Sequence, residues 1–309
     1  MGELKKITET ERIYLREFIQ KDAKYLYCLY NDREVIRYTG DSAFANEEAS
    51  GDFIANYEQY GKYGFGRWAV VRKADNEFLG WCGLKFRSDE AIVEVGCRFY
   101  KKYWGQGYAT EATGASLSYG FYKLKLAKIY AHVHQLNKAS FKVVSKCGFQ
   151  YVKDFDYNGL PASLFVKVNP GLMIKKIRPV ETHAVRQPVL RPGRPAETCS
   201  FEGDNLGTTF HLGAFFGEKL VGVVTMMRAG GYSYQLRGMA VLEEFRKKGI
   251  GEELVRRAEE HVRNGQGNLV WMNAREVALD FYKRLGYKKY GKKFNIPLIG
   301  NHYKMKKEL

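Results

Sequence analysis

The chain has 309 residues, of which 45% are hydrophobic and 15% aromatic. This length and composition allow two domains with separate cores and exclude a disordered protein. The formal net charge of +16 favours an anionic partner, such as nucleic acid, an acidic membrane or a phosphorylated cofactor. Five scattered cysteines without metal-ligand spacing, and no apolar run of 18 residues, predict a cytoplasmic protein without disulfides, metal sites or membrane spans.

The first half is predicted to open with helices and a hairpin. The hairpin strands are residues 68–72 and 78–84, which flank the polar segment 73–77. A third strand is expected over 91–99. It is followed by a glycine-containing turn and by a helix that begins at Tyr108 and continues to Phe121.

A boundary between two domains is predicted near residue 170. Residues 164–168 have the composition of a closing strand, the segment Asn169–Gly171 contains a Pro-Gly breaker, and residues 173–178 read as an opening strand. The second half then repeats the order of the first, with a hairpin at 211–215 and 220–224 and a strand over 235–242. An amphipathic helix from Ile250 follows. We therefore expect domains at residues 1–169 and 170–309.

Two short patterns recur in the same order in both halves. A basic residue followed by x-x-Gly-x-Gly occurs as KYWGQG at 102–107 and as RKKGIG at 246–251. A basic residue followed by x-Gly-aromatic occurs as KCGF at 146–149 and as RLGY at 284–287, 43 and 37 residues further on when the glycines are counted. Two ordered matches at similar spacing indicate a duplicated domain. The predicted fold class is α/β, with two tandem domains, each a mixed, mostly antiparallel sheet flanked by helices.

The glycine turns before the helices predict phosphate binding. The first turn of a helix leaves backbone N–H groups without internal partners, and together with the helix dipole these groups attract anions. An ordinary glycine turn is the alternative for either copy alone, and duplication makes it less favoured. Other phosphate motifs fit worse, because the Gly-x-x-x-x-Gly-Lys-[Ser/Thr] loop is absent and the glycines at 64 and 66 precede a strand.

The second half resembles the GNAT acetyltransferase family. The segment Leu236–Val241 followed by Arg246-x-x-Gly249-x-Gly251 is similar to the coenzyme A loop of that family. Residues 273–275 and 278–287 are similar to its later motif. The resemblance implies that Tyr282, the tyrosine of a Phe-Tyr pair, protonates the departing thiolate.

The first half resembles the branch of this family that acetylates the amino termini of ribosomal proteins and some small amines. The residues that carry the resemblance are 94–96, 103–112, and Asn137-x-x-Ser140 before KCGF. Lys102 is taken to stand where the family prefers Arg or Gln, and Val144 occupies the tyrosine position. In this branch the serine that matches Ser140 has been proposed as the acid instead.

The resemblance implies an enzyme that transfers an acetyl group directly from acetyl-CoA to a primary amine of a small molecule or a protein amino terminus. The catalytic candidates are Tyr282, Ser140 and Glu94, the last as a base by motif position, with a salt-bridged glutamate as the alternative. The predicted cofactor-binding residues are Cys97, Arg98, Phe99, Trp104, Gly105, Gln106, Gly107, Tyr108, Ala109, Thr110, Asn137, Met239, Ala240, Val241, Arg246, Lys247, Lys248, Gly249, Ile250, Gly251, Glu252, Asn273 and Phe281.

Several alternatives stay open from the sequence. One domain could be a binding or structural copy, or the chain could be a basic nucleic-acid-binding protein with the same fold, its lysines at 288, 289, 292 and 293 forming the binding face. No base is evident in the second half, where Glu243 and Glu244 are expected to face solvent and His211 is expected to be structural. The arginines at 186, 191 and 194 are interpreted as a solvated loop. An oligomer is possible.

Overall fold

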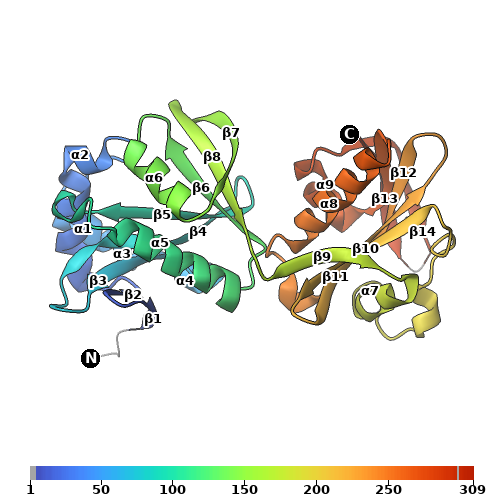
Figure 1. Ribbon diagram of the computed structural model, residues 1–309, viewed down its shortest axis with the longest axis horizontal. Coiled ribbons are helices and arrows are strands. Elements are labelled where there is room, and N and C mark those ends of the chain that lie inside the picture. The colour runs from blue at the N-terminus through green and yellow to red at the C-terminus, as the bar shows by residue number, and fades with distance from the viewer. Residues whose placement is uncertain (1–4, 298) are drawn as a thin grey trace. The chain divides into compact units, whose positions relative to one another are not determined.

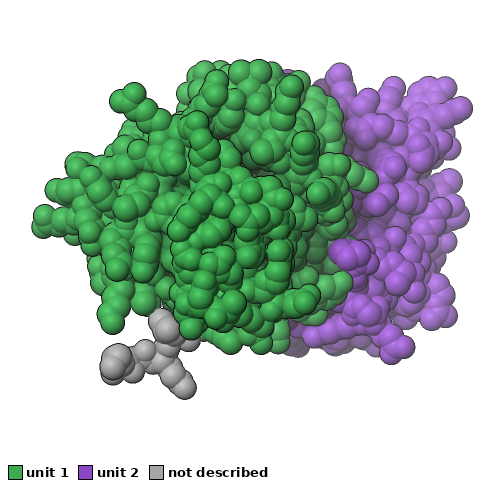
Figure 2. All heavy atoms as spheres, turned by 60° about the vertical axis from the view of Figure 1, so that its left-hand side comes forward, with its two compact units in different colours: residues 1–169 green, residues 170–309 purple. Residues whose placement is uncertain are grey.

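The computed structural model describes residues 5–297 and 299–309. The chain divides into two compact units, residues 1–169 and 170–309, which Figure 2 colours green and purple. Each unit contains one sheet of its own, and the sheets have eight and seven strands. The units are therefore described one at a time (Figure 1).

The sheet of the first unit has the order β1-β2-β3-β4-β5-β6-β8-β7. All neighbouring strands are antiparallel except β5 and β6, which are parallel. The strands are β1 (Lys6–Glu9), β2 (Ile13–Arg16), β3 (Arg67–Arg72), β4 (Phe78–Arg87), β5 (Ile92–Phe99), β6 (Lys128–His134), β7 (Gln150–Tyr157) and β8 (Leu160–Val168).

Helices cover both faces of this sheet. On one face α5 and α6 pack their buried side chains against the apolar residues of β3, β4 and β5. On the other face α1, α2 and α3 pack against Ala69, Val71 and Trp81. The α-helices are α1 (Ala23–Asn31), α2 (Arg33–Ile36), α3 (Glu47–Ala55), α4 (Gln59–Tyr63), α5 (Tyr108–Ser118) and α6 (Lys138–Lys146).

The sheet of the second unit has the order β14-β15-β13-β12-β11-β10-β9. Its only parallel neighbours are β12 and β13 among the strands that the structure describes. The strands are β9 (Leu172–Ile177), β10 (Thr209–Phe216), β11 (Lys219–Arg228), β12 (Ser233–Val241), β13 (Leu269–Arg275), β14 (Lys288–Ile296) and β15 (Gly300–Glu308).

The two longer helices of the second unit lie on opposite faces of its sheet. Val185 of α7 packs with Val223 and Ala240, whereas Leu254 of α8 contacts the neighbouring Gly222 from the other side, as alternation along a strand requires. The α-helices of this unit are α7 (His183–Leu190), α8 (Ile250–Asn264) and α9 (Leu279–Arg284).

The predicted architecture is confirmed, because both sheets are mixed, mostly antiparallel and flanked by helices. Both hairpins form as predicted, as β3–β4 and β10–β11. One expectation was wrong: the first unit opens with the strands β1 and β2 and not with helices. These strands of four residues each are too short to show a clear alternation of apolar residues. None of the described helices is long and apolar enough to cross a bilayer.

Candidate active sites

Each unit contains a helix that begins with a glycine in the left-handed conformation. Gly107 is the N-cap of α5, with φ 85°, and Gly249 is the N-cap of α8, with φ 81°. Neither helix has a side-chain cap. A side chain at either position would be strained, because positive φ favours glycine. The sequence prediction of two glycine turns at helix amino ends therefore has a clear structural counterpart.

The structure corrects the register in which the two turns were matched. Gly107 and Gly249 occupy the same place, so Gly105, with φ 76°, corresponds to Lys247, with φ 59°. The partner of Arg246 is then Trp104 and not Lys102. Lys102 lies outside the turn and forms an ion pair with Glu77. The error arose because both sequences contain Gly-x-Gly, and only backbone conformation shows which glycine caps the helix.

A shared hydrogen bond supports this register. The Trp104 indole N–H donates to the carbonyl of Phe99 over 2.8 Å, and the Arg246 Nε–H donates to the carbonyl of Val241 over 3.3 Å. Phe99 and Val241 are the last residues of β5 and β12. A tryptophan in the first unit therefore takes the place of the arginine in the second unit.

The backbone of the first turn offers a row of donors to an anion. No N–H group from Gly105 to Thr110 donates a hydrogen bond to another described residue, so these donors are free for an anion. Arg12 adds positive charge beside them: it pairs with Glu111 over 2.6 Å and donates to the Gln106 carbonyl over 3.1 Å. The contribution of Arg12 was not predicted, because it comes from a turn about 95 residues away.

In the first unit the parallel strands β5 and β6 pair at one position only among the described residues, between Glu94 and Tyr130. Beyond Glu94, the side of β5 that faces β6 has no ladder partner among the described residues. Gly96 and Cys97 are partly exposed there, although β5 is a central strand. Unpaired backbone N–H groups at this point are suitable donors for the carbonyl oxygen of an acyl group.

The second unit repeats this separation. Strands β12 and β13 are paired from Ser233 to Gln235, and no pairs follow toward the carboxyl end of β12 in the described residues. Met239 is partly exposed, whereas Ala240 and Val241 are buried. Met239 also lies close to Gly251, since a Cβ on that glycine would come within 2.6 Å of the Met239 methyl carbon and 3.5 Å of the Phe281 ring. Three predicted cofactor-binding residues therefore meet at the amino end of α8.

Glu94 is buried beside a histidine that the sequence prediction missed. Its carboxylate lies 2.7 Å from Nδ1 of His132 on β6, and 4.0 Å and 3.9 Å from the guanidinium groups of Arg67 and Arg87. Burial raises the pKa of Glu94, but the hydrogen bond of His132 and the charges of Arg67 and Arg87 outweigh it, so the pKa is lowered overall. Nε2 of His132 is buried and has no hydrogen-bond partner among the described residues, and the carboxylate of Glu90 lies 3.8 Å from it.

The predicted acid of the first unit lies in the first turn of α6. The side chain of Asn137 caps this helix by accepting a hydrogen bond from the Ser140 N–H over 3.0 Å. The Ser140 hydroxyl itself has no partner within the described part of the chain. It is half-buried and can therefore donate to an incoming group.

Tyr282, the predicted acid of the second unit, is almost fully buried on α9. Its ring contacts those of Phe281 and Tyr287, and its hydroxyl has no hydrogen-bond partner among the described residues. Burial raises the pKa of Tyr282. The phenol is therefore protonated at neutral pH and can act as a proton donor.

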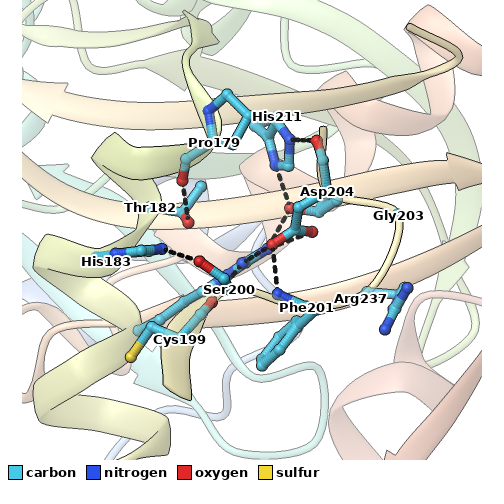
Figure 3. Close-up of polar contacts among 12 residues, drawn as sticks. Pro179, Thr182, His183, Cys199, Ser200, Phe201, Gly203, Asp204, His211 and Arg237 are labelled. Atoms are coloured by element: carbon cyan, nitrogen blue, oxygen red, sulfur yellow. Dashed lines mark hydrogen bonds and ion pairs between the residues drawn. The ribbon is translucent and has the colours of Figure 1, made fainter. Parts of the chain in front are cut away.

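A buried polar network lies on the face of the second sheet that α7 covers, and Figure 3 shows Asp204 and His211 within it. Arg186 forms an ion pair with Asp204 over 2.5 Å and donates to the Thr225 hydroxyl over 2.6 Å. His211 contacts Thr225 through Nδ1 and the Asp204 carbonyl through Nε2. Burial lowers the pKa of His211. The interpretation of Arg186 as a solvated loop residue was wrong, since it lies in α7 and is fully buried.

The remaining predicted residues are distributed along the same elements. Asn273 is exposed on β13, and Glu244 is exposed and pairs with Lys219. The lysines at 288, 289, 292 and 293 lie exposed on the edge strand β14, a common means of blunting a sheet edge. Among the described residues no group of side chains could hold a metal ion.

Comparison with known proteins agrees with this geometry. Two family models, both described as an acetyltransferase (GNAT) domain, match residues 12–150 and residues 208–289. A stretch of 144 residues is 35% identical to YitI, an uncharacterized N-acetyltransferase of Bacillus subtilis, and covers 45% of this chain and 97% of that protein. The chain belongs to the GNAT acetyltransferase family. Acetyl-CoA is the acyl donor of this family, so the prediction of a tandem GNAT enzyme that uses acetyl-CoA is confirmed.

Other relatives cover similar lengths. The spermidine N(1)-acetyltransferase of Escherichia coli is 27% identical over 160 residues, which are 48% of this chain and 80% of that enzyme. The crystal structure of a GNAT-family acetyltransferase from Bacillus anthracis is 26% identical, has a TM-score of 0.47, and covers 52% of this chain and 98% of that chain.

Proposed function

We propose that both units of this GNAT protein bind acetyl-CoA and that the first unit acetylates the primary amine of a small molecule or a protein amino terminus. The observation that carries this proposal is the row of N–H groups from Gly105 to Thr110 at the amino end of α5, which donate to no other described residue, close to the carboxyl end of β5, which pairs with β4 but has no described β6 partner beyond Glu94. The loop N–H groups and Arg12 hold the pyrophosphate, and the bound cofactor supplies an activated acetyl thioester.

His132 and Glu94 form the proton-accepting pair of the first unit. An amine must lose a proton to attack a thioester, and a carboxylate with a lowered pKa is a weak acceptor by itself. Nε2 of His132 has no hydrogen-bond partner among the described residues, while its Nδ1 faces Glu94. Glu94 thus fixes the tautomer of the imidazole and stabilises the imidazolium, and His132 takes the proton at Nε2. This assignment gives Glu94 a positioning role in place of the base expected from its motif position.

The acids differ between the units. In the first unit the Ser140 hydroxyl is placed to donate a proton to the departing sulfur, and in the second unit the Tyr282 hydroxyl has that role. The position that corresponds to Glu94 in the second unit is Leu236, because Gly96 and Gly238 are equivalent in the corrected register. The second unit therefore has an acid and a cofactor loop but no carboxylate at the expected position, which supports the alternative that it binds acetyl-CoA without fast turnover.

Calorimetric titration of acetyl-CoA into the full chain tests the proposal. We expect two molecules bound per wild-type chain, and one after either Gly107→Glu or Gly249→Glu, because a glutamate at a left-handed N-cap strains the turn and repels phosphate. Gly61→Glu is a matched control, since this glycine lies in α4 with open space around its Cβ position and no positive φ. Wild type that binds no acetyl-CoA, or substitutions without effect on the stoichiometry, would contradict the proposal.

A further inference from the structure

Buried donors without protein partners gather on the face of the first sheet that α1, α2 and α3 cover. Nε and Nη1 of Arg98 and Nε1 of Trp81 are fully buried and have no hydrogen-bond acceptor among the described residues. Arg98 is 6% exposed and Trp81 is 3% exposed. They are direct cross-strand neighbours in β5 and β4, so their side chains share this face. Unpaired buried donors are costly unless a ligand satisfies them.

The same face also holds the proton-accepting pair. Glu94 lies four residues before Arg98 in β5, and the residue between them on this face is Gly96, which has no side chain and is partly exposed. The Trp81 ring lies 3.5 Å from the Cβ position of Gly96. A ligand that reaches the Gly96 backbone therefore has Glu94 and His132 on one side and Arg98 on the other, with the benzene edge of the Trp81 indole beside it.

Positive charge exceeds negative charge around these residues. Arg98 pairs through Nη2 with Asp41, which is 41% exposed, and the Arg67 guanidinium lies over the Trp81 ring, 4.5 Å from its centroid. Lys85, the cross-strand neighbour of Glu94, has no ion-pair partner in the described part of the chain. Burial and then the charge of Arg67 lower the pKa of Lys85. An anionic ligand would relieve this imbalance, whereas a polycation would increase it.

The second unit provides an internal comparison. In the corrected register Ala240 corresponds to Arg98, and its cross-strand neighbour Val223 corresponds to Trp81. These two residues form part of an apolar cluster with Val185 of α7. The sheet position itself thus accepts small apolar side chains, and the buried donors of the first unit are not required by the fold.

We propose that the first unit acetylates amines that also carry a carboxylate, and that Arg98 and the Trp81 indole N–H bind this carboxylate. The inference rests on the proposed acetyltransferase activity of the first unit and narrows its acceptor class. Amines without an anionic group, including polyamines, are poor acceptors of this unit. The contacts are charge-assisted hydrogen bonds from a guanidinium and an indole that are already held in place by burial and stacking.

The test compares how fast the full chain acetylates matched acceptors when acetyl-CoA is the donor. Release of coenzyme A thiol is measured for small amino acids, for their carboxamides and for spermidine. We expect kcat/KM for each carboxylate to exceed that of its carboxamide by roughly 10- to 100-fold, the range of a buried charge-assisted contact. Arg98→Met should bring this ratio close to one, and Trp81→Phe, which keeps the ring, should lower it about fivefold.

Asp41→Asn is the matched control, because it removes the other partner of Arg98 and leaves the donors in place. It should keep the preference for carboxylates; equal loss of the preference in Arg98→Met and Asp41→Asn would show that the ion pair is merely structural. Preference for carboxamides or spermidine would overturn the inference and leave the acetyltransferase activity intact. If no amine is acetylated, binding of N-acetylated amino acids and their amides decides: carboxylates that bind wild type and not Arg98→Met support the inference, and absence of such binding overturns it.

Discussion

At the scale of single residues, the two units differ in the side chains proposed for proton transfer. Among the described residues the Tyr282 and Ser140 hydroxyls have no hydrogen-bond partner, but only Tyr282 is embedded among aromatic rings. Val144 stands four residues before Gly148, as Tyr282 stands four residues before Gly286. The first unit therefore has no phenol at this position, and a hydroxyl on the first turn of α6 is its nearest equivalent.

We predict that Tyr282→Phe slows acetyl transfer by the second unit by about 100-fold, the lower range for loss of a general acid. Binding of acetyl-CoA should stay nearly unchanged, because the ring and its contacts are kept. Tyr287→Phe is the matched control: its hydroxyl donates to Glu259 over 2.8 Å, so its loss affects stability and not chemistry. Turnover that is unaltered in Tyr282→Phe, measured by thiol release, rules out Tyr282 as the acid.

The lowered pKa of Glu94 predicts that the stability of the first unit depends on pH. The pKa of Glu94 is lowered in the folded state, so the unfolded chain binds the proton more tightly and stability rises with pH through this range. The contribution is complete above the ordinary glutamate pKa of about 4.3 and is lost as pH falls through the lowered value. Above this window Glu94 is charged.

Glu94→Gln should lower kcat/KM of the first unit by about tenfold, because the His132 imidazole loses the carboxylate that orients it. His132→Gln should reduce kcat/KM by about 100-fold or more. Glu90→Gln is the control, since this exposed carboxylate lies 3.8 Å from Nε2 of His132. A loss in Glu94→Gln as large as that in His132→Gln would instead identify Glu94 as the base.

At the scale of the elements, the equivalent strands β5 and β12 differ in backbone conformation at a matching glycine. Gly96 of β5 and Gly238 of β12 occupy matching positions, yet only Gly238 has a positive φ, of 53°. Its backbone lies against the buried guanidinium of Arg186, and a Cβ there would come within 2.6 Å of Nε. The bend in β12 is therefore coupled to the polar network beneath it.

Gly238→Ala should destabilise the second unit by about 3 kcal/mol or more, since it combines a strained backbone with displacement of a buried ion pair. Gly96→Ala is the matched control and should change the free energy of unfolding by less than about 1 kcal/mol, because its Cβ would make an ordinary contact with the Trp81 ring. Denaturant titration measures both values. Equal effects of the two substitutions would contradict the proposed coupling.

At the scale of the whole molecule, the two units have the same architecture with different buried groups on the equivalent sheet face. The glycine turn at the helix amino end is present in both, whereas this face carries Glu94, Arg98 and His132 in the first unit and the network of Arg186 and Asp204 in the second. The glycine turn is therefore common to both units, and the groups on this sheet face differ between them. The alternative of a catalytically slow second unit agrees with this pattern.

The structure shows which of the basic residues are paired and which are exposed. Many of the cations are paired with nearby carboxylates, as Arg12 is with Glu111 and Lys102 is with Glu77. The lysines of β14 remain exposed along a sheet edge. The net charge of +16 is therefore compatible with binding of an anionic cofactor at two loops.

The sequence by itself determined the local features. Hydrophobic periodicity and turn residues placed the hairpins, the strands before the loops and the helices after them, because these signals act over a few neighbouring residues. Repetition of Gly-x-Gly in a matching order predicted the duplicated domain and phosphate binding, and the resemblance to the GNAT family implied the cofactor. The register of the repeat was misjudged, since two glycines in each loop look alike until φ shows that Gly107 and Gly249 are the caps.

Only the tertiary structure decided how distant segments complete the sites. Arg12 donates to the Gln106 carbonyl in the loop. His132 contacts Glu94 on the neighbouring strand, and Arg186 is buried with Asp204. None of these contacts follows from spacing along the chain, because strand order and packing bring together residues that are far apart in sequence. Burial then decides their chemistry, since it determines which charges are paired and which donors remain for a ligand.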